Sequence, residues 1–356
     1  MAARQPRFKT MVRIQFGQPL SLEILAKLGK LGVFSHHGGP LQVLGRNEGV
    51  FFLGAANLPK LLRSPLAVKV NPLTNFRLAG LYRIHFKVVE QGFQGKVSFR
   101  ISSPREGFGK KLIYLEEQVL PALNLTRQID SAGNRWINVS LHVKEKTRHL
   151  KLNFYFIYHV DVAQILEHSL SMVPLNEPIG PVVNSQALQM LKPSPKIDSA
   201  SPRIRLMAKS LFGEGRHLSA HAKYRRVQSF VKNYLPYDHQ KRARFFGGKM
   251  VYKSMAQMYN HPETTLDRGQ AACPSVSILE ASLLRASGVP ARTAGRWGHF
   301  YTELYIPGRG WLSSSVTPTG IPLVRDVDYR HQPLVSWEPE IAVQTTMWGG
   351  NVKVLE

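Results

Sequence analysis

Apolar and polar residues alternate along several short segments between residues 79 and 165. The apolar positions are Tyr82, Ile84, Phe86 and Val88, then Val97, Phe99 and Ile101, then Val139, Leu141 and Val143, and finally Leu150, Leu152, Phe154, Phe156, Tyr158, Val160 and Val162. Turn-forming residues separate these segments at 91–95, 104–109 and 132–134. Short strands of period two joined by regular turns favour an antiparallel β-sandwich over residues 79–165.

The apolar period changes to that of a helix after Pro202. One predicted helix has its apolar face on Ile204, Met207, Ala208 and Leu211, and a second, over residues 218–234, has it on Tyr224, Val227, Phe230 and Tyr234. Near the N-terminus, residues 20–31 also fit an amphipathic helix. An α+β chain is therefore expected, with strands first and helices afterwards.

These patterns divide the 356 residues into four parts, which agrees with a length sufficient for two or three domains. Residues 1–78 form an N-terminal segment of unclear fold, and residues 79–165 form the sandwich. Residues 166–203 are rich in proline and predict a partly extended linker. Residues 204–356 form the last domain, whose final part from about 320 is expected to pair back as strands or to wrap the domain.

Cys273, the one cysteine of the chain, stands at the predicted start of a helix. Pro274 suits the first helical position because its missing N–H would have no partner there. Gly288 and Pro290 then end the helix. The N–H groups and the dipole of a helix N-terminus favour a thiolate, so Cys273 is a candidate nucleophile. A lone cysteine is, however, more often a small buried apolar residue than a catalyst.

A candidate base follows at His299, in a strand-like segment that ends at a turn over residues 307–311. Taken singly, a histidine is more often a structural residue of the core or the surface than a base. The order of the two residues and their surroundings therefore decide between the structural and the catalytic interpretation.

This order resembles the transglutaminase-like family of papain-type cysteine enzymes. The residues that match are the phrase Arg-Ala-Ser-Gly-Val-Pro-Ala-Arg from Arg285 to Arg292, the pair His299 and Glu303 on the strand, and Gly310 with Trp311 at the turn. The similarity covers about residues 200–320. It implies a helix carrying the cysteine packed on an antiparallel sheet carrying the histidine. The β-sandwich before it resembles the domain that precedes the catalytic domain in many prokaryotic transglutaminase-like proteins.

The chain departs from the family pattern at two positions. Ala271 stands where the family has glycine, and Ser315 stands where it has the aspartate that follows the tryptophan by four residues. The third member of such a triad orients the imidazole and stabilises its cation. A serine hydroxyl accepts a hydrogen bond but carries no charge, so it should weaken the thiolate–imidazolium pair. Asp326 or Asp328 could take this place from a later loop.

The resemblance implies acyl transfer through a thioester on a protein or peptide amide. Cys273 would attack the carbonyl, His299 would take and return the proton, and Ser315 would orient His299. The N–H of Cys273 and the side chain of Gln270 could form an oxyanion hole, with Trp297 as a further candidate for contacting the substrate. No residue identifies the acyl acceptor, so transglutaminase, amidase and protease remain open. No metal or other cofactor is expected.

A non-catalytic scaffold that binds nucleic acid or protein is the alternative. The missing aspartate and the net charge of +24 favour it, whereas the retained Cys273 and His299 favour an enzyme. Such a charge attracts polyanions without regard to sequence. The densest basic run has Lys241, Arg242, Arg244 and Lys249 interleaved with aromatic residues. This arrangement suits nucleic-acid stacking, although a surface loop anchored by its two phenylalanines is the simpler interpretation.

The compartment is constrained only weakly. A single cysteine rules out a disulfide within the chain. The first residues are basic but lack the apolar core of a signal peptide, which favours a cytoplasmic location, and no stretch is long and apolar enough to span a bilayer.

Overall fold

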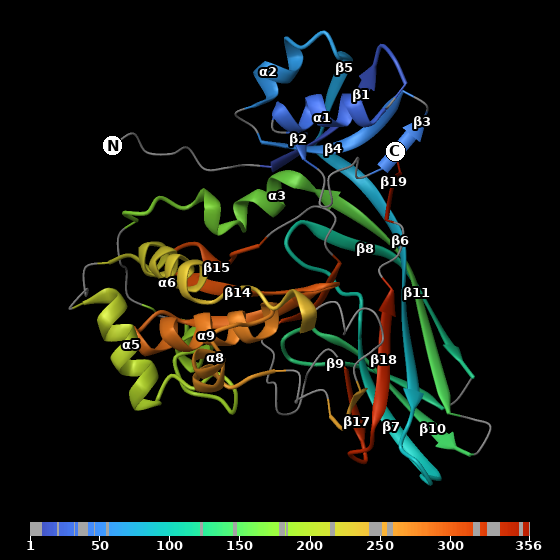
Figure 1. Cartoon of the computed structure of the whole chain (residues 1–356), viewed down its shortest axis with the longest axis vertical. Coiled ribbons are helices and arrows are strands. Elements are labelled where there is room, and N and C mark those ends of the chain that lie inside the picture. The colour runs from blue at the N-terminus through green and yellow to red at the C-terminus, as the bar shows by residue number, and fades with distance from the viewer. Residues whose placement is uncertain are drawn as a thin grey trace.

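The computed structural model describes most of the chain. The described ranges are residues 9–19, 21–31, 33–34, 42–45, 47–54, 57–121, 124–144, 148–177, 182, 184–213, 218–241, 251–254, 259–315, 321–325, 335–348 and 352–355. Within them the protein has three parts: a small N-terminal α/β unit, a β-sandwich of two sheets, and a helical domain around a fourth sheet (Figure 1).

The N-terminal segment forms its own small α/β unit. Its elements are β1 (Lys9–Phe16), α1 (Leu22–Lys30), β2 (Val33–Phe34), β3 (Gln42–Gly45), β4 (Glu48–Gly54), α2 (Leu58–Leu62) and β5 (Ala67–Leu73). The strand order is β2-β4-β1-β5, with β3 also on β4. Helix α1, at the position predicted for a helix, buries Ile24 and Leu28 against Val12 and Ile14 of β1. This core explains why residues 9–73 fold as a unit.

The expected antiparallel β-sandwich is confirmed. Its strands from the predicted region are β6 (Asn75–Val88), β7 (Gly95–Ser103), β8 (Lys110–Leu120), β9 (Leu125–Ile129), β10 (Arg135–Val143) and β11 (His149–Asp161). One sheet contains β7, β10 and β9, and the other contains β6, β11 and β8. The alternating apolar residues face inwards, so that Phe86, Phe99, Phe154 and Phe156 are almost fully buried in one core.

The C-terminal residues complete the sandwich and do not stay in the last domain. Strand β17 (Val335–Glu338) pairs with β7, while β18 (Val343–Trp348) and β19 (Lys353–Leu355) both pair with β6. The expected boundary of 204–356 therefore differs from the structure at its end. The apolar pattern of these residues correctly indicated strands, but a local period carries no information about which sheet a strand joins.

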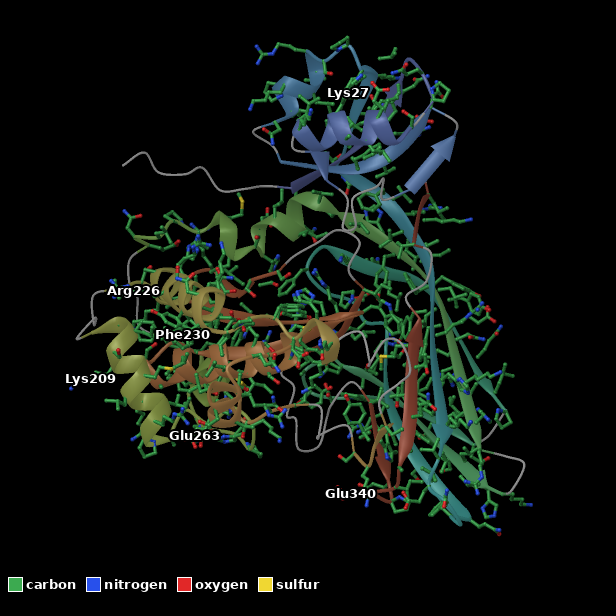
Figure 2. All side chains as sticks on the ribbon, viewed as in Figure 1. Lys27, Lys209, Arg226, Phe230, Glu263 and Glu340 are labelled. Carbon is green, nitrogen blue, oxygen red and sulfur yellow. The ribbon has the colours of Figure 1, made fainter. Side chains whose placement is uncertain are left out.

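The helical domain surrounds a four-stranded antiparallel sheet. Its helices are α5 (Pro202–Phe212), α6 (Ala220–Tyr234), α8 (Pro262–Arg268) and α9 (Cys273–Ala286). The sheet has the order β15-β14-β13-β16, with β13 (Ala291–Arg296), β14 (His299–Ile306), β15 (Gly310–Ser313) and β16 (Pro322–Arg325). Helix α9 lies centrally and is buried from Ser277 to Arg285. The exposed cations Lys209 and Arg226 lie on the outer helices α5 and α6 (Figure 2).

The segment between sandwich and helical domain is more ordered than a linker. It contains α3 (Val162–Glu167), the 3-10 turn η2 (Leu170–Met172) and α4 (Ser185–Gln189). The short strand β12 (Val251–Tyr252) comes later in the chain, after α6, and pairs with β18. Leu170, Val173 and Ile197 are buried in the core of the helical domain. Among the described residues, no helix is long and apolar enough to cross a membrane.

Candidate active site

Cys273 is the first residue of helix α9, as the sequence predicts. The chain reaches it through Gly269, whose φ of 61° ends helix α8 in the left-handed region. Ala271 then pairs with the segment after α6: its N–H donates to the Pro236 carbonyl at 3.2 Å, and its carbonyl accepts from the Asp238 N–H at 3.0 Å. The start of α9 is thereby fixed from outside the helix, and the Cys273 side chain is half-buried.

Helix α9 and strand β14 pack with a definite register. The Thr302 hydroxyl on β14 donates to Glu280 Oε2 at 2.6 Å and approaches the Ser277 carbonyl at 3.5 Å. His299 is about 10 Å before Thr302 along the strand, and Cys273 about 6 Å before Ser277 along the helix. Because the later residues of both elements share one core, the two run in the same direction. Cys273 and His299 therefore lie at the same end of this layer.

The β13–β14 hairpin positions His299. Its turn consists of Trp297 and Gly298, and the φ of 73° at Gly298 suits glycine. Arg296 pairs directly with His299 across the two strands. Such partners carry their side chains on the same face of the sheet. Trp297 packs against Tyr82 of the sandwich with a ring-centroid distance of 4.4 Å, so this turn is held by the neighbouring domain.

Arg296 links this hairpin to Cys273 and to Ser315. Its guanidinium donates from Nη1 to the Ser315 carbonyl at 3.1 Å and from Nη2 to Ser315 Oγ at 3.2 Å. Burial lowers the pKa of Arg296, while the charged forms of Tyr301 and Cys273 act in the opposite direction. Arg296 and Cys273 are therefore near enough to interact electrostatically. The position of Arg296 beside His299 was not predicted from the sequence.

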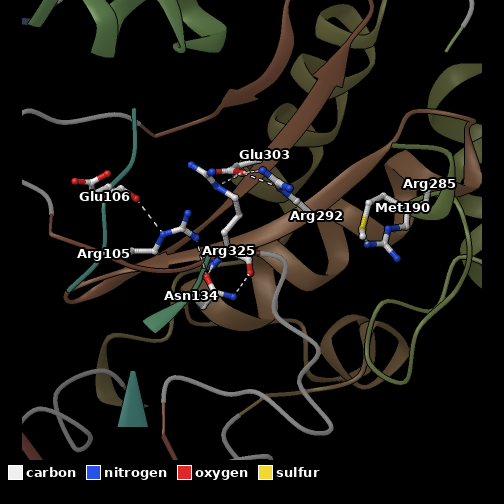
Figure 3. A network of polar contacts seen from close by, with 8 residues as sticks. All are labelled: Arg105, Glu106, Asn134, Met190, Arg285, Arg292, Glu303 and Arg325. Carbon is white, nitrogen blue, oxygen red and sulfur yellow. Dashed lines mark hydrogen bonds and ion pairs between the residues drawn. The ribbon is translucent and has the colours of Figure 1, made fainter. Parts of the chain in front are cut away.

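Glu303, the glutamate of the family pattern, links strands of the sheet through ion pairs. It is fully buried, and its Oε2 accepts from Arg292 at 2.8 Å and lies 3.3 Å from Arg325 Nε (Figure 3). Burial alone would raise the pKa of Glu303, but Arg325 and Arg292 together lower it. Arg292 also lies over the Trp311 ring, 3.9 Å from its centroid. The matched residues Arg292, Glu303 and Trp311 thus form one structural unit.

Arg285 completes the structural part of the matched phrase. Its Nε donates to the Ala291 carbonyl and its Nη1 to the Lys192 carbonyl, both at 2.7 Å. It also meets Met190 Sδ at 3.5 Å, as the right side of Figure 3 shows. Arg285 therefore ties the end of α9 to the segment before α5.

The predicted site residues are distributed as follows. The structure brings Cys273, His299, Trp297 and Ser315 to the hairpin end of the sheet, whereas Gln270 is exposed. The catalytic roles of these residues stay predictions. Of the basic run, Lys241 is half-buried, and Arg242, Arg244 and Lys249 lie outside the described residues, as do Asp326 and Asp328. The described residues contain no group of three or more side chains suited to a metal ion.

Part of the chain matches a known protein family, and its fold is similar to that of a solved structure. Residues 213–315 match the family model of the transglutaminase-like superfamily. A "putative cysteine protease" from Cytophaga hutchinsonii has a similar structure, with a TM-score of 0.55 and 16% sequence identity over 79% of this chain and 91% of that one. The periplasmic domain of TgpA from Pseudomonas aeruginosa aligns with a TM-score of 0.29 and 14% identity, over 87% and 90% of the two chains. No curated protein sequence matches the chain.

Proposed function

Since residues 213–315 form a transglutaminase-like domain, we propose that this protein cleaves or transfers an amide bond through a thioester on Cys273. The domain's superfamily is one of cysteine-based hydrolases and acyltransferases. The observation that carries the proposal is that Cys273 begins α9 and His299 begins β14, at the same end of the α9–β14 layer, with Arg296 paired with His299 across the strands.

The reaction follows from the properties of these groups. The Cys273 thiol gives its proton to His299, and the thiolate attacks the carbonyl carbon of the amide. The C–N bond of the tetrahedral intermediate breaks, and the leaving amine takes the proton from His299. Water or a second amine then attacks the thioester and releases Cys273. The N–H groups at the start of α9 are suited to stabilise the oxyanion.

Two groups could support the imidazole in this scheme. Ser315 remains the predicted partner, and its Oγ already accepts a hydrogen bond from Arg296. A hydroxyl oxygen has two lone pairs, so Ser315 Oγ can accept from Arg296 and also from the N–H of the His299 imidazole. Arg296 is the second group: it pairs with His299 across β13 and β14, and its two hydrogen bonds to Ser315 can hold Ser315 towards the imidazole.

The test measures hydrolysis of a peptide library and incorporation of a fluorescent primary amine into peptides. We expect Cys273→Ala and His299→Asn each to lower the rate by more than about a thousandfold, as for other nucleophile–base pairs. His159→Asn is the matched control, because His159 is exposed on β11. Turnover that persists in Cys273→Ala would exclude the thioester. The partition between water and amine distinguishes hydrolase from acyltransferase.

A second property, binding of polyanions, is proposed from the net charge of +24. Affinity for heparin or RNA should fall at least tenfold between 50 and 200 mM salt if several anionic groups are engaged. Charge reversal of Lys241, Arg242, Arg244 and Lys249 should flatten this dependence more than reversal of four exposed sandwich lysines. The sandwich set is Lys87, Lys96, Lys111 and Lys151. Equal effects of both sets would indicate a diffuse field without a dedicated basic site.

A further inference from the structure

Strand β8 forms one edge of the six-stranded sheet of the sandwich. Within the described part of the chain, it pairs with β11 alone, over residues 110–120. Three of its apolar side chains are largely exposed: Ile113 at 52%, Leu120 at 51% and Tyr114 at 46%. A long edge strand with exposed apolar residues is a surface to which a further strand can add.

The charge pattern of β8 is complementary to itself in the antiparallel direction. Residues 110–117 read Lys-Lys-Leu-Ile-Tyr-Leu-Glu-Glu, with the cations at one end and the anions at the other. An antiparallel second copy, centred on this segment, gives the pairs Lys110 with Glu117, Lys111 with Glu116, Leu112 with Leu115, and Ile113 with Tyr114. Each pair occurs twice because a two-fold axis relates the copies, and opposite charges directly across two strands attract.

An irregularity in β8 places the paired charges on the same face of the sheet. The register of β8 on β11 shifts at Ile113, which is the extra residue of a β-bulge. Lys111 lies opposite His159, and Glu116 lies opposite Tyr155. His159 and Tyr155 are four residues apart on β11 and share its outer face. Lys111 and Glu116 therefore lie on that face as well, which positions five apart in a regular strand would not do.

The charged groups of this outer pair are exposed and ionised. Lys111 and Glu116 are both exposed. The Glu116 carboxylate accepts hydrogen bonds from the Tyr114 hydroxyl and from the Gln118 amide, both at 2.7 Å. These two bonds lower the pKa of Glu116, so its side chain is an anion at neutral pH. Both bonds come from β8 itself and hold the carboxylate on the outer face, where the lysine of a second copy would meet it.

The inner groups of β8 contribute less to such a pairing. Lys110 is buried, and Glu117 already accepts hydrogen bonds from two side chains of its own chain. The Leu112 N–H donates to Glu106 Oε1 at 3.3 Å. This backbone group thus takes an acceptor from outside the ladder, and a carbonyl of the second copy would replace Glu106 there. The outer pair of Lys111 and Glu116 is therefore the one that decides the specificity of the contact.

We infer that two copies of this chain associate through β8 and join their six-stranded sheets into one continuous sheet. Lysines and bulges often keep an edge strand from pairing, but here the bulge aligns the charges and the glutamates compensate the lysines. The net charge of +24 opposes association. Its effect is screened beyond about 8 Å at physiological salt, whereas paired residues lie about 5 Å apart. A contact of one strand pair is small for an interface, so the dimer is reversible.

Sedimentation velocity of the full chain over a range of concentrations tests the inference. We expect the fraction of dimer to rise with concentration. Lys111→Glu and Glu116→Lys each replace two attractive contacts by repulsive ones and should each weaken dimerisation about tenfold. Lys87→Glu on β6 and Glu167→Lys on α3 make the same changes of net charge at exposed positions and should leave the dimer unchanged.

Mixing the two single variants gives the sharpest result. In a mixed dimer of Lys111→Glu with Glu116→Lys, both contacts again join opposite charges, so the mixture should regain the wild-type affinity. This recovery also shows that both variants are folded, and the double variant should dimerise alone.

Three outcomes would overturn the inference. The wild-type chain could stay monomeric up to about 500 µM, which would leave the β8 edge to a strand of a different protein. A wild-type dimer that both single variants retain would place the contact on another surface. A mixture of the two folded variants that stays monomeric would exclude the register. None of these outcomes depends on the chemistry at Cys273.

Discussion

Two buried glutamates lie at opposite faces of strand β14, and their surroundings differ. Glu280 reaches β14 from helix α9, accepts a hydrogen bond from Thr302, and has its pKa raised to about 7 by burial. Glu303 belongs to β14 itself and faces Arg292 and Arg325, which lower its pKa against the effect of burial. The surroundings of Glu280 therefore favour its neutral, protonated form, and those of Glu303 favour its anionic form.

This difference divides the domain into a neutral side and a charged side. The side towards α9 is an apolar core formed with Leu279, Leu283 and Leu304, which holds the helix that begins at Cys273. The other side carries Arg296 and Tyr301, which line a cavity of about 30 Å³ together with residues of the β7–β8 loop and β16. The neutral side therefore fixes the position of the thiol, and the charged side lies towards Arg296 and His299 of the proposed site.

The largest expected effect comes from neutralising the charged side. Glu303→Gln leaves Arg292, whose side chain is only 3% exposed, without its ionic partner. Removing one member of a buried pair should lower the free energy of unfolding by about 3–5 kcal/mol, measured by urea denaturation at pH 7. Asp267→Asn breaks the exposed pair with Arg203 and should cost less than about 1 kcal/mol. Equal losses of unfolding free energy in the two variants would contradict the division into a neutral and a charged side.

Glu303 and Glu280 should also make the free energy of unfolding depend on pH in opposite directions. The lowered pKa of Glu303 means that its stabilising contribution is present above the ordinary glutamate pKa of 4.5 and is lost as the pH falls through its folded value. The raised pKa of Glu280 means that its contribution is present below 4.5 and is lost as the pH rises through about 7.

Glu280→Gln isolates the second dependence, because the amide oxygen can keep the bond from Thr302 and does not titrate. Between pH 5 and pH 8, the wild-type protein should lose on the order of 2–3 kcal/mol relative to this variant, by linkage. Urea denaturation of both proteins at the two pH values measures this difference. An identical change in both proteins would show that Glu280 is ionised throughout the range.

A smaller effect is expected at Trp311, the aromatic partner of Arg292 on the charged side. Trp311→Leu removes the cation–π contact and should lower the free energy of unfolding by about 1–2 kcal/mol. Trp311→Phe keeps an aromatic face and should cost less than half as much. Thermal unfolding of the two variants tests this order, and a reversed order would mean that packing alone determines the role of Trp311.

The sequence predicted the elements of this architecture well where the pattern was local. The alternation at residues 150–162 became β11, and the helical spacing after Pro202 became α5 and α6. Pro274 indicated the start of α9 at Cys273, and Gly288 and Pro290 indicated its end. In each case a short run of residues contains the whole signal, because one face of the element is buried.

Long-range pairing and buried polar groups could not be predicted in the same way. Residues 335–338 and 343–348 joined the sandwich, although the sequence places them after the helical domain. Arg296 is a single cation in a short strand, a pattern that also describes an exposed edge. In the structure it is only 9% exposed and lines a cavity together with residues of the β7–β8 loop. Glu280 likewise occupies a core position that local polarity would assign to a surface.

The proposed function requires a reactive thiol at Cys273, and alkylation by iodoacetamide tests this requirement most directly. Because Cys273 is the sole cysteine, the rate of loss of free thiol reports on this residue alone. We predict a rate at pH 6 within about fivefold of the rate at pH 8, together with a steeper dependence in His299→Asn and Arg296→Gln. A wild-type rate that rises about tenfold per pH unit from pH 6 to 8, as for an ordinary thiol, would contradict the account.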